Sequence, residues 1–378
     1  MSVPDAPASL PVPPDPDAAA AREEEDRFRG LLEAELVSFL TERTRMLREV
    51  SAESVPLLEA IHALARGGKR LRALLCYWGF RGAGGAPLDP VAVRAGLALE
   101  LFQSAALIHD DIIDRSDTRR GAPSVHRRFT GTHRDSGWHL DGDRFGTSAA
   151  ILAGDLCLAL SEEVFTSVGP AAAHGTAARD IFNRMRTEVM AGQYLDILEE
   201  VVGPGHRPED AVRRARNILR YKAAKYTTEH PLAIGGALAG ADSGLQQAYA
   251  AFSLPLGEAF QLRDDVLGVF GDPETTGKPA GDDLREGKRT VLIAYTLEHG
   301  DAGVRAEVSG SLGAADLNDD GVQRLRALIT ETGALAATEE LIAGHTAAAD
   351  RALAALDLPT PAGAALARLA DAAVRRRA

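Results

Sequence analysis

Three aspartates in the first third of the chain have the spacing of a metal-binding site. Asp110 and Asp114 are four residues apart and Asp111 precedes Asp114 by three, so on a helix they share one face. Like charges at this spacing repel each other unless cations lie among them. Carboxylate oxygens suit Mg²⁺, which keeps several waters and accepts phosphate oxygens. The segment therefore predicts a magnesium site for a phosphate-bearing ligand, and an exposed acidic helix end is the alternative.

A second pair of adjacent carboxylates, Asp264 and Asp265, lies near the end of an apolar segment that runs from Phe252 to Phe270. In helical proteins, ligand sites are commonly built in the core from polar groups on facing helices. Two acidic helix ends that face each other across one cavity would hold metal ions from both sides. The sequence therefore predicts two opposing metal-binding walls.

Lysines and arginines stand beside glycines at four places in the chain. Glycine lets backbone N–H groups approach a phosphate, lysine neutralises its charge, and arginine binds its oxygens in pairs. The cations concerned are Lys69, Arg70, Arg72, Arg119, Arg120, Lys278 and Lys288. We expect them to clamp a diphosphate. For Arg119 and Arg120, ordinary ion pairs with Asp114 and Asp117 are the alternative.

The elements that must position these residues are predicted to be helices. Apolar residues recur three or four apart, and strand-like alternation is nearly absent. The segment from Val91 to His109 is apolar on all sides, which predicts a central buried helix. Residues 119–146, 271–287 and 300–321 are rich in Gly, Pro or charge and predict loops. With 45% apolar and 5% aromatic residues, the chain is expected to form a large all-α bundle around an apolar cavity.

Composition divides the chain into two parts and excludes several classes of protein. Residues 1–21 are rich in Pro and Ala and predict a disordered extension without a signal peptide, and residues 22–378 predict one domain. A net charge of −12 argues against a nucleic-acid surface. Cys76 and Cys157 lie in separate apolar stretches, which predicts buried thiols in a reducing, cytoplasmic compartment. No uninterrupted run of about 18 apolar residues occurs, so no membrane span is expected.

Motifs in chain order resemble those of the trans-isoprenyl diphosphate synthases, or polyprenyl synthetases, and are most like those of bacterial geranylgeranyl diphosphate synthases. They are Gly67–Arg72, Asp110–Asp114, Arg119–Gly121, Gly192–Asp196 and Phe260–Asp265. The resemblance covers most of the chain. It implies the isoprenoid synthase fold, a homodimer, and a prenyltransferase that condenses isopentenyl diphosphate with dimethylallyl, geranyl or farnesyl diphosphate.

The resemblance also implies a role for individual residues. Isopentenyl diphosphate would be bound by Lys69, Arg72, Gln103 and Arg120. The allylic diphosphate would be bound by Arg119, Lys222, Gln261, Lys278 and Lys288. Mg²⁺, three ions in each site with Mn²⁺ as a substitute, would be held by Asp110, Asp111, Asp114, Asp264 and Asp265, which with Lys222 form the expected catalytic set.

The chain departs from the family pattern at three positions. Gln103 stands where many members have His, and Ala223 follows Lys222 where Thr or Ser is usual. Gly268 replaces the last Asp of the second aspartate motif, which is tolerable if Asp264 and Asp265 hold the metal. Gln103 can still donate to phosphate through its amide, whereas Ala223 removes one hydroxyl.

The implied reaction is ionisation of the allylic carbon–oxygen bond, attack by the isopentenyl double bond and loss of a proton. The product chain is expected to extend along the central helix toward its start. Ala105 and Ala106, one turn before Asp110, would leave space for it, with Phe102 as the next floor. We therefore expect geranylgeranyl rather than farnesyl diphosphate. The alternative is that both alanines only pack helices together.

Three other functions remain open at this stage. A class I terpene cyclase or diphosphate lyase shares the helical fold and an aspartate-rich site, but does not need the cationic cluster from Lys69 to Arg72. A non-catalytic partner subunit of a heteromeric prenyltransferase would explain Gly268 and Ala223 as signs of decay. His109 beside Asp110 would also suit a metal phosphohydrolase, but the additional histidine ligands are not evident. His126, His133 and His139 lie in a predicted loop rich in charge and glycine.

Overall fold

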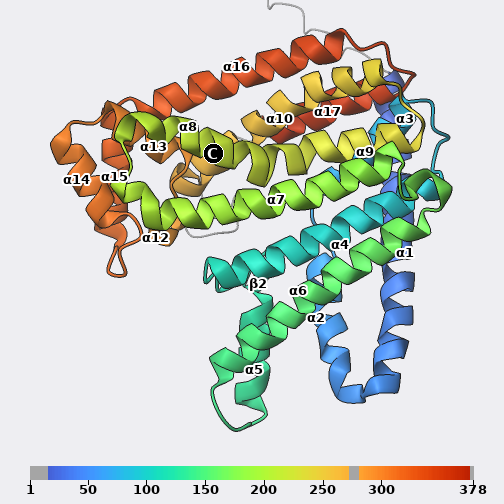
Figure 1. Ribbon diagram of the computed structural model, residues 1–378, viewed down its shortest axis with the longest axis horizontal. Helices are drawn as coiled ribbons and strands as arrows, with labels where there is room; N and C mark the ends of the chain where they lie inside the picture. Colours follow the sequence, from blue (N-terminus) through green and yellow to red (C-terminus); the bar gives the residue numbers. More distant parts are fainter. Residues whose placement is uncertain (1–15, 272–280, 375–378) are drawn as a thin grey trace, which may run out of the picture.

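The computed structural model describes residues 16–271 and 281–374, whose regular structure is almost entirely helical (Figure 1). The predicted all-α class is confirmed. The first half forms α1 (Pro16–Val50), α2 (Val55–Ala65), α3 (Leu71–Gly82), α4 (Pro90–Ile113), α5 (Val125–Asp135), α6 (Gly142–Ser167) and α7 (Ala177–Val202). The second half forms α8 (Ala211–Ile218), the π-helix η5 (Leu219–Glu229), α9 (His230–Leu238), α10 (Ser243–Phe270), α12 (Asp282–Glu286), α13 (Val291–His299), α14 (Ala302–Ser311), α15 (Asp319–Glu331), α16 (Ala334–Ala354) and α17 (Ala362–Val374). Two-residue strands β1 (Thr118–Arg119) and β2 (Ala122–Pro123) pair antiparallel between α4 and α5.

Helix α4 is the central element that the sequence predicts. Pro90 occupies its first turn, where no N–H is needed, and the side chain of Asp89 caps it by accepting a hydrogen bond from Val91 N at 2.8 Å. It packs against α3 and against α6, which runs beside it in Figure 1. Its apolar side chains are buried on most sides. It is long and apolar enough to cross a membrane by length and composition, but 72% of its most apolar window is buried within the protein. The last turn of α4 carries the first acidic pair.

Helix α10 delivers the second acidic pair and begins earlier than predicted. Asp242 caps it by accepting from Leu245 N at 2.8 Å, so the helix starts at Ser243 rather than near Phe252. Its buried face carries Leu256, Leu262 and Val266, among others. The helix continues to Phe270, as predicted.

The π-helix η5 lies between α7 and α10 and approaches both closely. A Cβ atom added at Gly192 of α7 would lie 2.4 Å from Lys222 N, and one added at Gly257 of α10 would lie 2.6 Å from Ala224 O. A π-helix is wider than an α-helix because its hydrogen bonds span five residues. Glycine on each neighbouring helix therefore makes room for the wide turn that carries Lys222.

Several predicted boundaries differ from the structure. Helix α1 begins at Pro16, six residues before the predicted start of the domain, and its Ala21 is fully buried. Residues 1–15 of the predicted extension lie outside the described residues. Helix α5 lies within the predicted loop 119–146. It was not predicted because most of its residues are charged or polar and only a short stripe, which includes Val125 and Phe129, is buried. Helix α14 similarly lies within the predicted loop 300–321.

Both cysteines are free and fully buried, as predicted. Burial raises the pKa of the Cys76 thiol to about 12, because the thiolate would lose its hydration. The pKa of Cys157 is raised for the same reason. Neither thiol is therefore a nucleophile at neutral pH.

Candidate active site

The acidic ends of α4 and α10 open onto one cavity of about 840 Å³. Asp110 from α4 lines it together with Asp264 and Asp265 from α10, so the two predicted walls share one space. Its other polar lining residues include Lys69, Arg72, Gln103, Arg119, Gln193, Asp196, Lys222, Gln261, Asp283 and Lys288. Its apolar lining residues include Leu107, Val189, Leu219 and Phe260. This mixture suits a ligand with a charged head and an apolar tail.

Asp111 does not line the cavity, although the sequence placed it on the same surface as Asp110. It is fully buried and accepts hydrogen bonds from Nε and Nη2 of Arg119, with 2.8 Å between Nε and Oδ1. Because it directly follows Asp110, its side chain points about 100° further around the helix. Asp111 thus holds Arg119, whose Nη2 lies 3.7 Å from Asp110. Asp117, the alternative partner considered for Arg119, is paired with Arg127 at 2.6 Å.

We call the acidic end of α4 the first wall and that of α10 the second wall. Two lysines from other elements reach the carboxylates of the first wall. Lys222 of η5 contacts Asp196 of α7, and its Nζ lies 3.8 Å from Asp110. Lys288 Nζ lies 3.0 Å from Asp114 Oδ2. Burial lowers the pKa of both lysines, but their carboxylate neighbours raise it by more, so each pKa lies above its ordinary value. Both lysines therefore remain charged inside the cavity.

The second wall has a different environment. Asp265 is almost fully buried, and its Oδ1 accepts a hydrogen bond from Gln261 Nε2 at 2.9 Å. Burial raises the pKa of Asp265 to about 7, and the nearby carboxylates of Asp283 and Asp264 add to the rise. The hydrogen bond from Gln261 opposes this shift without cancelling it.

The predicted isopentenyl diphosphate residues gather at another part of the cavity. The guanidinium of Arg72 donates to Thr227 Oγ1 at 2.8 Å and lies 4.2 Å from the centre of the Tyr226 ring. The hydroxyl of Tyr226 donates to Gln103 Oε1 at 2.6 Å. Lys69 also lines the cavity. Gln103 is therefore connected to Arg72 through Tyr226.

Arg120 lies behind this group rather than in the cavity lining. Its Nη1 donates to a backbone carbonyl of α2 at 2.7 Å, and its Nη2 lies 2.9 Å from where a Cβ at Gly68 would be. It thus supports the glycine turn that precedes Lys69. Arg70, in the same cationic cluster, is buried and ion-paired with Glu100 at 2.9 Å.

The donor set of the cavity fits a hard divalent cation. Within residues 16–271 and 281–374, no three or more His, Cys, Asp or Glu side chains form a ready-made metal cage. Burial raises the pKa of Asp114 as well as that of Asp265, so added positive charge would favour both carboxylates. Mg²⁺ keeps several waters and is commonly bound by one or two carboxylates plus phosphate oxygens. The two walls therefore suit magnesium bound together with a diphosphate.

The structure separates the residues expected to set product length. Ala106 lines the cavity, whereas Ala105 is fully buried and outside its lining. Ala105 lies two turns after Ala98, whose carbonyl accepts a hydrogen bond from a serine of α6 at 2.6 Å. Ala105 therefore faces α6. Phe102 is buried, and its ring centre lies 5.6 Å from that of Tyr226, which lines the cavity.

Three acidic residues near the cavity received no role from the sequence. Asp196 lies within the predicted Gly192–Asp196 motif, and its contact with Lys222 was not foreseen. Glu200 lies one turn further along α7, and burial raises its pKa to about 7. Asp283 belongs to another Asp–Asp pair, which directly follows Gly281, and this pattern was a signal that could have identified it. Lys278, in contrast, was assigned a role but lies outside the described residues.

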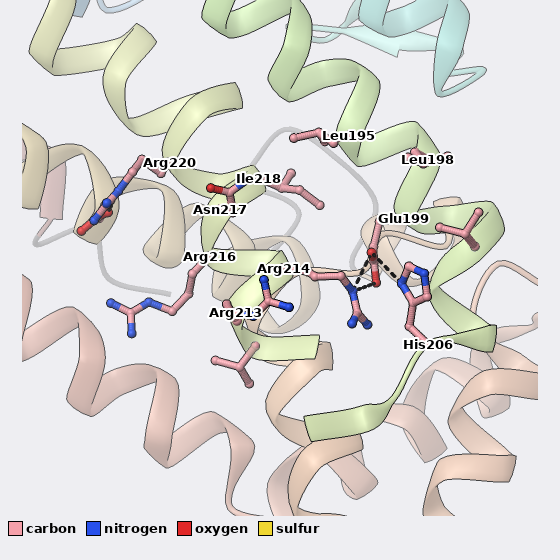
Figure 2. A pocket seen from close by; sticks show the side chains of 13 residues that line it. Leu195, Leu198, Glu199, His206, Arg213, Arg214, Arg216, Asn217, Ile218 and Arg220 are labelled. Atoms are coloured by element: carbon pink, nitrogen blue, oxygen red, sulfur yellow. Dashed lines mark hydrogen bonds and ion pairs between the residues drawn. The ribbon is translucent and has the colours of Figure 1, made fainter. Parts of the chain in front are cut away.

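A second cavity, of about 750 Å³, is lined mainly by α7 and α8 and contains several arginines (Figure 2). Arg214 and His206 both point toward Glu199, with 3.0 Å between Arg214 Nε and Glu199 Oε2. Arg220 is paired with Glu258 at 2.8 Å. Arg214 and Arg220 are thus met by the protein's own carboxylates, and the lining lacks an adjacent aspartate pair. The first cavity is therefore the candidate active site.

Comparison with known proteins places this geometry in a family. Residues 55–329 match the family described as Polyprenyl synthetase. The chain is 33% identical over 279 residues to a geranylfarnesyl diphosphate synthase of Aeropyrum pernix, covering 73% of this chain and 80% of that protein. It is 32% identical to a geranylgeranyl diphosphate synthase of Methanosarcina mazei, covering 71% and 74% of the two chains.

A solved structure shares nearly the whole fold. It is that of a geranylgeranyl pyrophosphate synthase from Corynebacterium glutamicum, complexed with isoprenyl diphosphate and magnesium. The TM-score is 0.87 and the sequences are 36% identical, with 93% of this chain and 99% of the other covered.

Proposed function

The chain belongs to the polyprenyl synthetase family and is a chain-elongating trans-prenyltransferase, and we propose that it joins isopentenyl diphosphate to an allylic diphosphate with Mg²⁺. One observation carries this proposal most directly. Carboxylates from α4 and α10 line the same cavity as cations from four other segments of the chain. Such a site binds a metal together with an anion, rather than either one alone.

The proposed reaction divides the cavity between two diphosphates. Lys222, Lys288 and Arg119 would hold the allylic diphosphate near Asp110. Lys69 and Arg72 would hold isopentenyl diphosphate in the part of the cavity that contains Gln103. Each cation stabilises negative charge without taking part in proton transfer.

Within this scheme, magnesium would be held by Asp110, Asp114, Asp264 and Asp265, and it would neutralise the departing diphosphate when bound. Asp111 would act through Arg119 instead. The apolar lining, which includes Leu107, Val189 and Phe260, would keep water from the allylic cation.

The proposed product is geranylgeranyl diphosphate. Ala106 lines the cavity close to Asp110, where a small side chain leaves room for a growing prenyl chain. Phe102 and Tyr226, whose rings pack edge to face, would form the floor. The names of several relatives, which include geranylgeranyl and geranylfarnesyl diphosphate synthases, support a product of this size.

The proposal includes a homodimer in the cytoplasm. Ile151 and Leu152 on α6 and Ile113 at the end of α4 are 44%, 59% and 41% exposed. Apolar side chains gathered on packed helices favour a protein interface. The two buried thiols support a reducing compartment. Light scattering of the purified protein measures the mass and decides between monomer and dimer.

A class I terpene cyclase is the nearest competing function. It would use a single diphosphate, and the separate group of Lys69, Arg72 and Gln103 would then have no ligand. The deciding experiment incubates the protein with isopentenyl diphosphate, Mg²⁺ and allylic primers of increasing length, followed by chromatography of the dephosphorylated products. We expect longer prenyl alcohols. Conversion of a primer to a hydrocarbon without isopentenyl diphosphate would establish the cyclase instead.

A further inference from the structure

The second aspartate wall lacks a side chain at one position of α10. Gly268 lies one turn after Asp264 on α10 and also lines the cavity. Residues four apart on a helix share a face, so a side chain at position 268 would extend the wall formed by Asp264. Glycine leaves that position without a carboxylate.

Another carboxylate occupies the space beside Gly268. A Cβ atom added at Gly268 would lie 1.9 Å from Asp283 Oδ2 and 2.7 Å from its Cγ. Asp283 belongs to α12, which follows α10 in the described chain, and it lines the same cavity. The side chain of Asp283 therefore fills the volume that a side chain at position 268 would need.

The backbone around α12 fixes this position. Gly281 N–H donates to Gly268 O at 3.1 Å, which ties the start of α12 to α10. Gly281 and Gly287, at the two ends of α12, have φ values of +80° and +83°, a conformation that favours glycine. Leu284 is 1% exposed and anchors the short helix in the core. The backbone that carries Asp283 is thus held by the packing of Leu284 and by the hydrogen bond from Gly281 to α10.

The charges around Asp283 match those of the metal walls. Its Oδ1 lies 3.6 Å from Lys288 Nζ, the lysine that also contacts Asp114 of the first wall. Its carboxylate is close enough to Asp265 to influence that group electrostatically. Asp283 and Asp114 of the first wall therefore both lie close to Lys288.

We propose that Asp283 is a metal-binding residue that supplies, from α12, the third carboxylate of the second wall. The inference rests on the proposed function, because it assumes a metal-bound diphosphate in this cavity. If Asp283 has this role, glycine is needed at position 268 because Asp283 occupies the adjacent space. Gly268 is then no evidence for a non-catalytic partner subunit. The two positions form one unit in which a single carboxylate can be accommodated.

The test exchanges the carboxylate between the two positions. The variants are Asp283→Ala, Asp283→Asn, Gly268→Asp and the double variant Gly268→Asp/Asp283→Ala. Asp350→Ala, which removes an exposed carboxylate from α16, is the matched control. The readout is Mn²⁺ affinity by electron paramagnetic resonance in the presence of methylenediphosphonate, since Mn²⁺ takes the same carboxylate ligands as Mg²⁺. Circular dichroism checks that each variant is folded.

We expect Asp283→Ala and Asp283→Asn to weaken Mn²⁺ binding by about 10- to 100-fold. The double variant should recover affinity to within about threefold of the unchanged protein, because the carboxylate introduced at position 268 enters the vacated space. Gly268→Asp alone should bind less well than the double variant, because its side chain meets Asp283. Asp350→Ala should bind as the unchanged protein does.

The inference is overturned if both Asp283 variants keep their Mn²⁺ affinity, or if a folded double variant recovers none of it. It is also overturned if the unchanged protein does not bind Mn²⁺ with the diphosphonate. Failure of the proposed function looks different. In that case the protein binds Mn²⁺ and the diphosphonate, responds to the exchange as expected, and yet forms no longer prenyl diphosphate.

Discussion

The ends of α4 and α10 carry similar aspartate pairs, but the surroundings of Asp265 on α10 differ from those of the carboxylates on α4. At α4, cations lie beside all three carboxylates: Lys222 near Asp110, Arg119 on Asp111 and Lys288 on Asp114. At α10, Asp265 accepts a side-chain hydrogen bond from the neutral amide of Gln261, and other carboxylates lie close by.

This difference indicates what each wall contributes. Each carboxylate of the first wall already has a cation of the protein beside it, although burial still raises the pKa of Asp114. Asp265 of the second wall has a pKa of about 7, and a bound cation would favour its charged form strongly. We infer that the second wall gains most from magnesium, and that both walls must contact the same metal-bound diphosphate.

The largest expected effect comes from removing one cavity-lining carboxylate from either wall. Asp110→Asn and Asp264→Asn should each lower kcat by about 10²- to 10³-fold, because each removes charge that fixes the leaving diphosphate. Steady-state kinetics with isopentenyl and farnesyl diphosphates measure the loss. Asp350→Asn should retain full activity, and a kcat within about twofold for either wall variant would break the comparison.

A smaller loss is expected when Lys222 is displaced without changing any charge. In Gly192→Ala the new methyl would lie 2.4 Å from Lys222 N, so η5 must shift and carry the lysine away from Asp110. We expect kcat to fall by about 10- to 100-fold. The control is Gly30→Ala, also within a helix, where an added Cβ has no neighbour within 4 Å. Equal activity of the two variants would show that the close approach at Gly192 has no part in placing Lys222.

The charge difference between the walls should also appear in the pH dependence of stability. The pKa of Asp265 rises from 3.8 to about 7 on folding, so between these values the folded state binds more protons than the unfolded state. Without metal, the free energy of unfolding should fall as pH rises from about 4 to about 7, by an amount on the order of a few kcal/mol. Asp265→Asn should flatten that fall, as measured by thermal unfolding in a chelator. Parallel profiles for the two proteins would contradict the charge difference.

The smallest effect in free energy concerns product length. Ala106→Phe places a ring in the cavity and should shift the main product from geranylgeranyl toward farnesyl diphosphate, as measured by chromatography. Ala105→Phe places the ring toward α6 and should lower stability by about 1–3 kcal/mol through overpacking. If Ala105→Phe alone shortened the product, the assignment of Ala106 to the cavity would be wrong.

The sequence predicted the features that depend on pattern within one helix. The all-round apolar character of Val91–His109 identified α4, and the Asp pairs identified the ends of α4 and α10. The meeting of the two acidic helix ends was also predicted, but particular contacts between segments were not. The contact between Gly268 and Asp283, and that between Gly192 and Lys222, require the packed structure.

Local geometry also limited the prediction. Counting residues placed Asp111 on the same face as Asp114, but its buried position is decided by Arg119, which lies beyond the helix end. The π-helix η5 has no signal in hydrophobic spacing, because that spacing assumes a regular turn. It nevertheless fixes the position of Lys222.

The most direct test asks whether the two walls hold one ligand. Thermal unfolding of the unchanged protein, Asp110→Asn and Asp264→Asn is measured with and without Mg²⁺ and methylenediphosphonate together. The account predicts a clear rise in Tm for the unchanged protein and the loss of most of that rise in both variants. A rise that persists in full in either variant would contradict the claim that both walls bind the same metal-bound diphosphate.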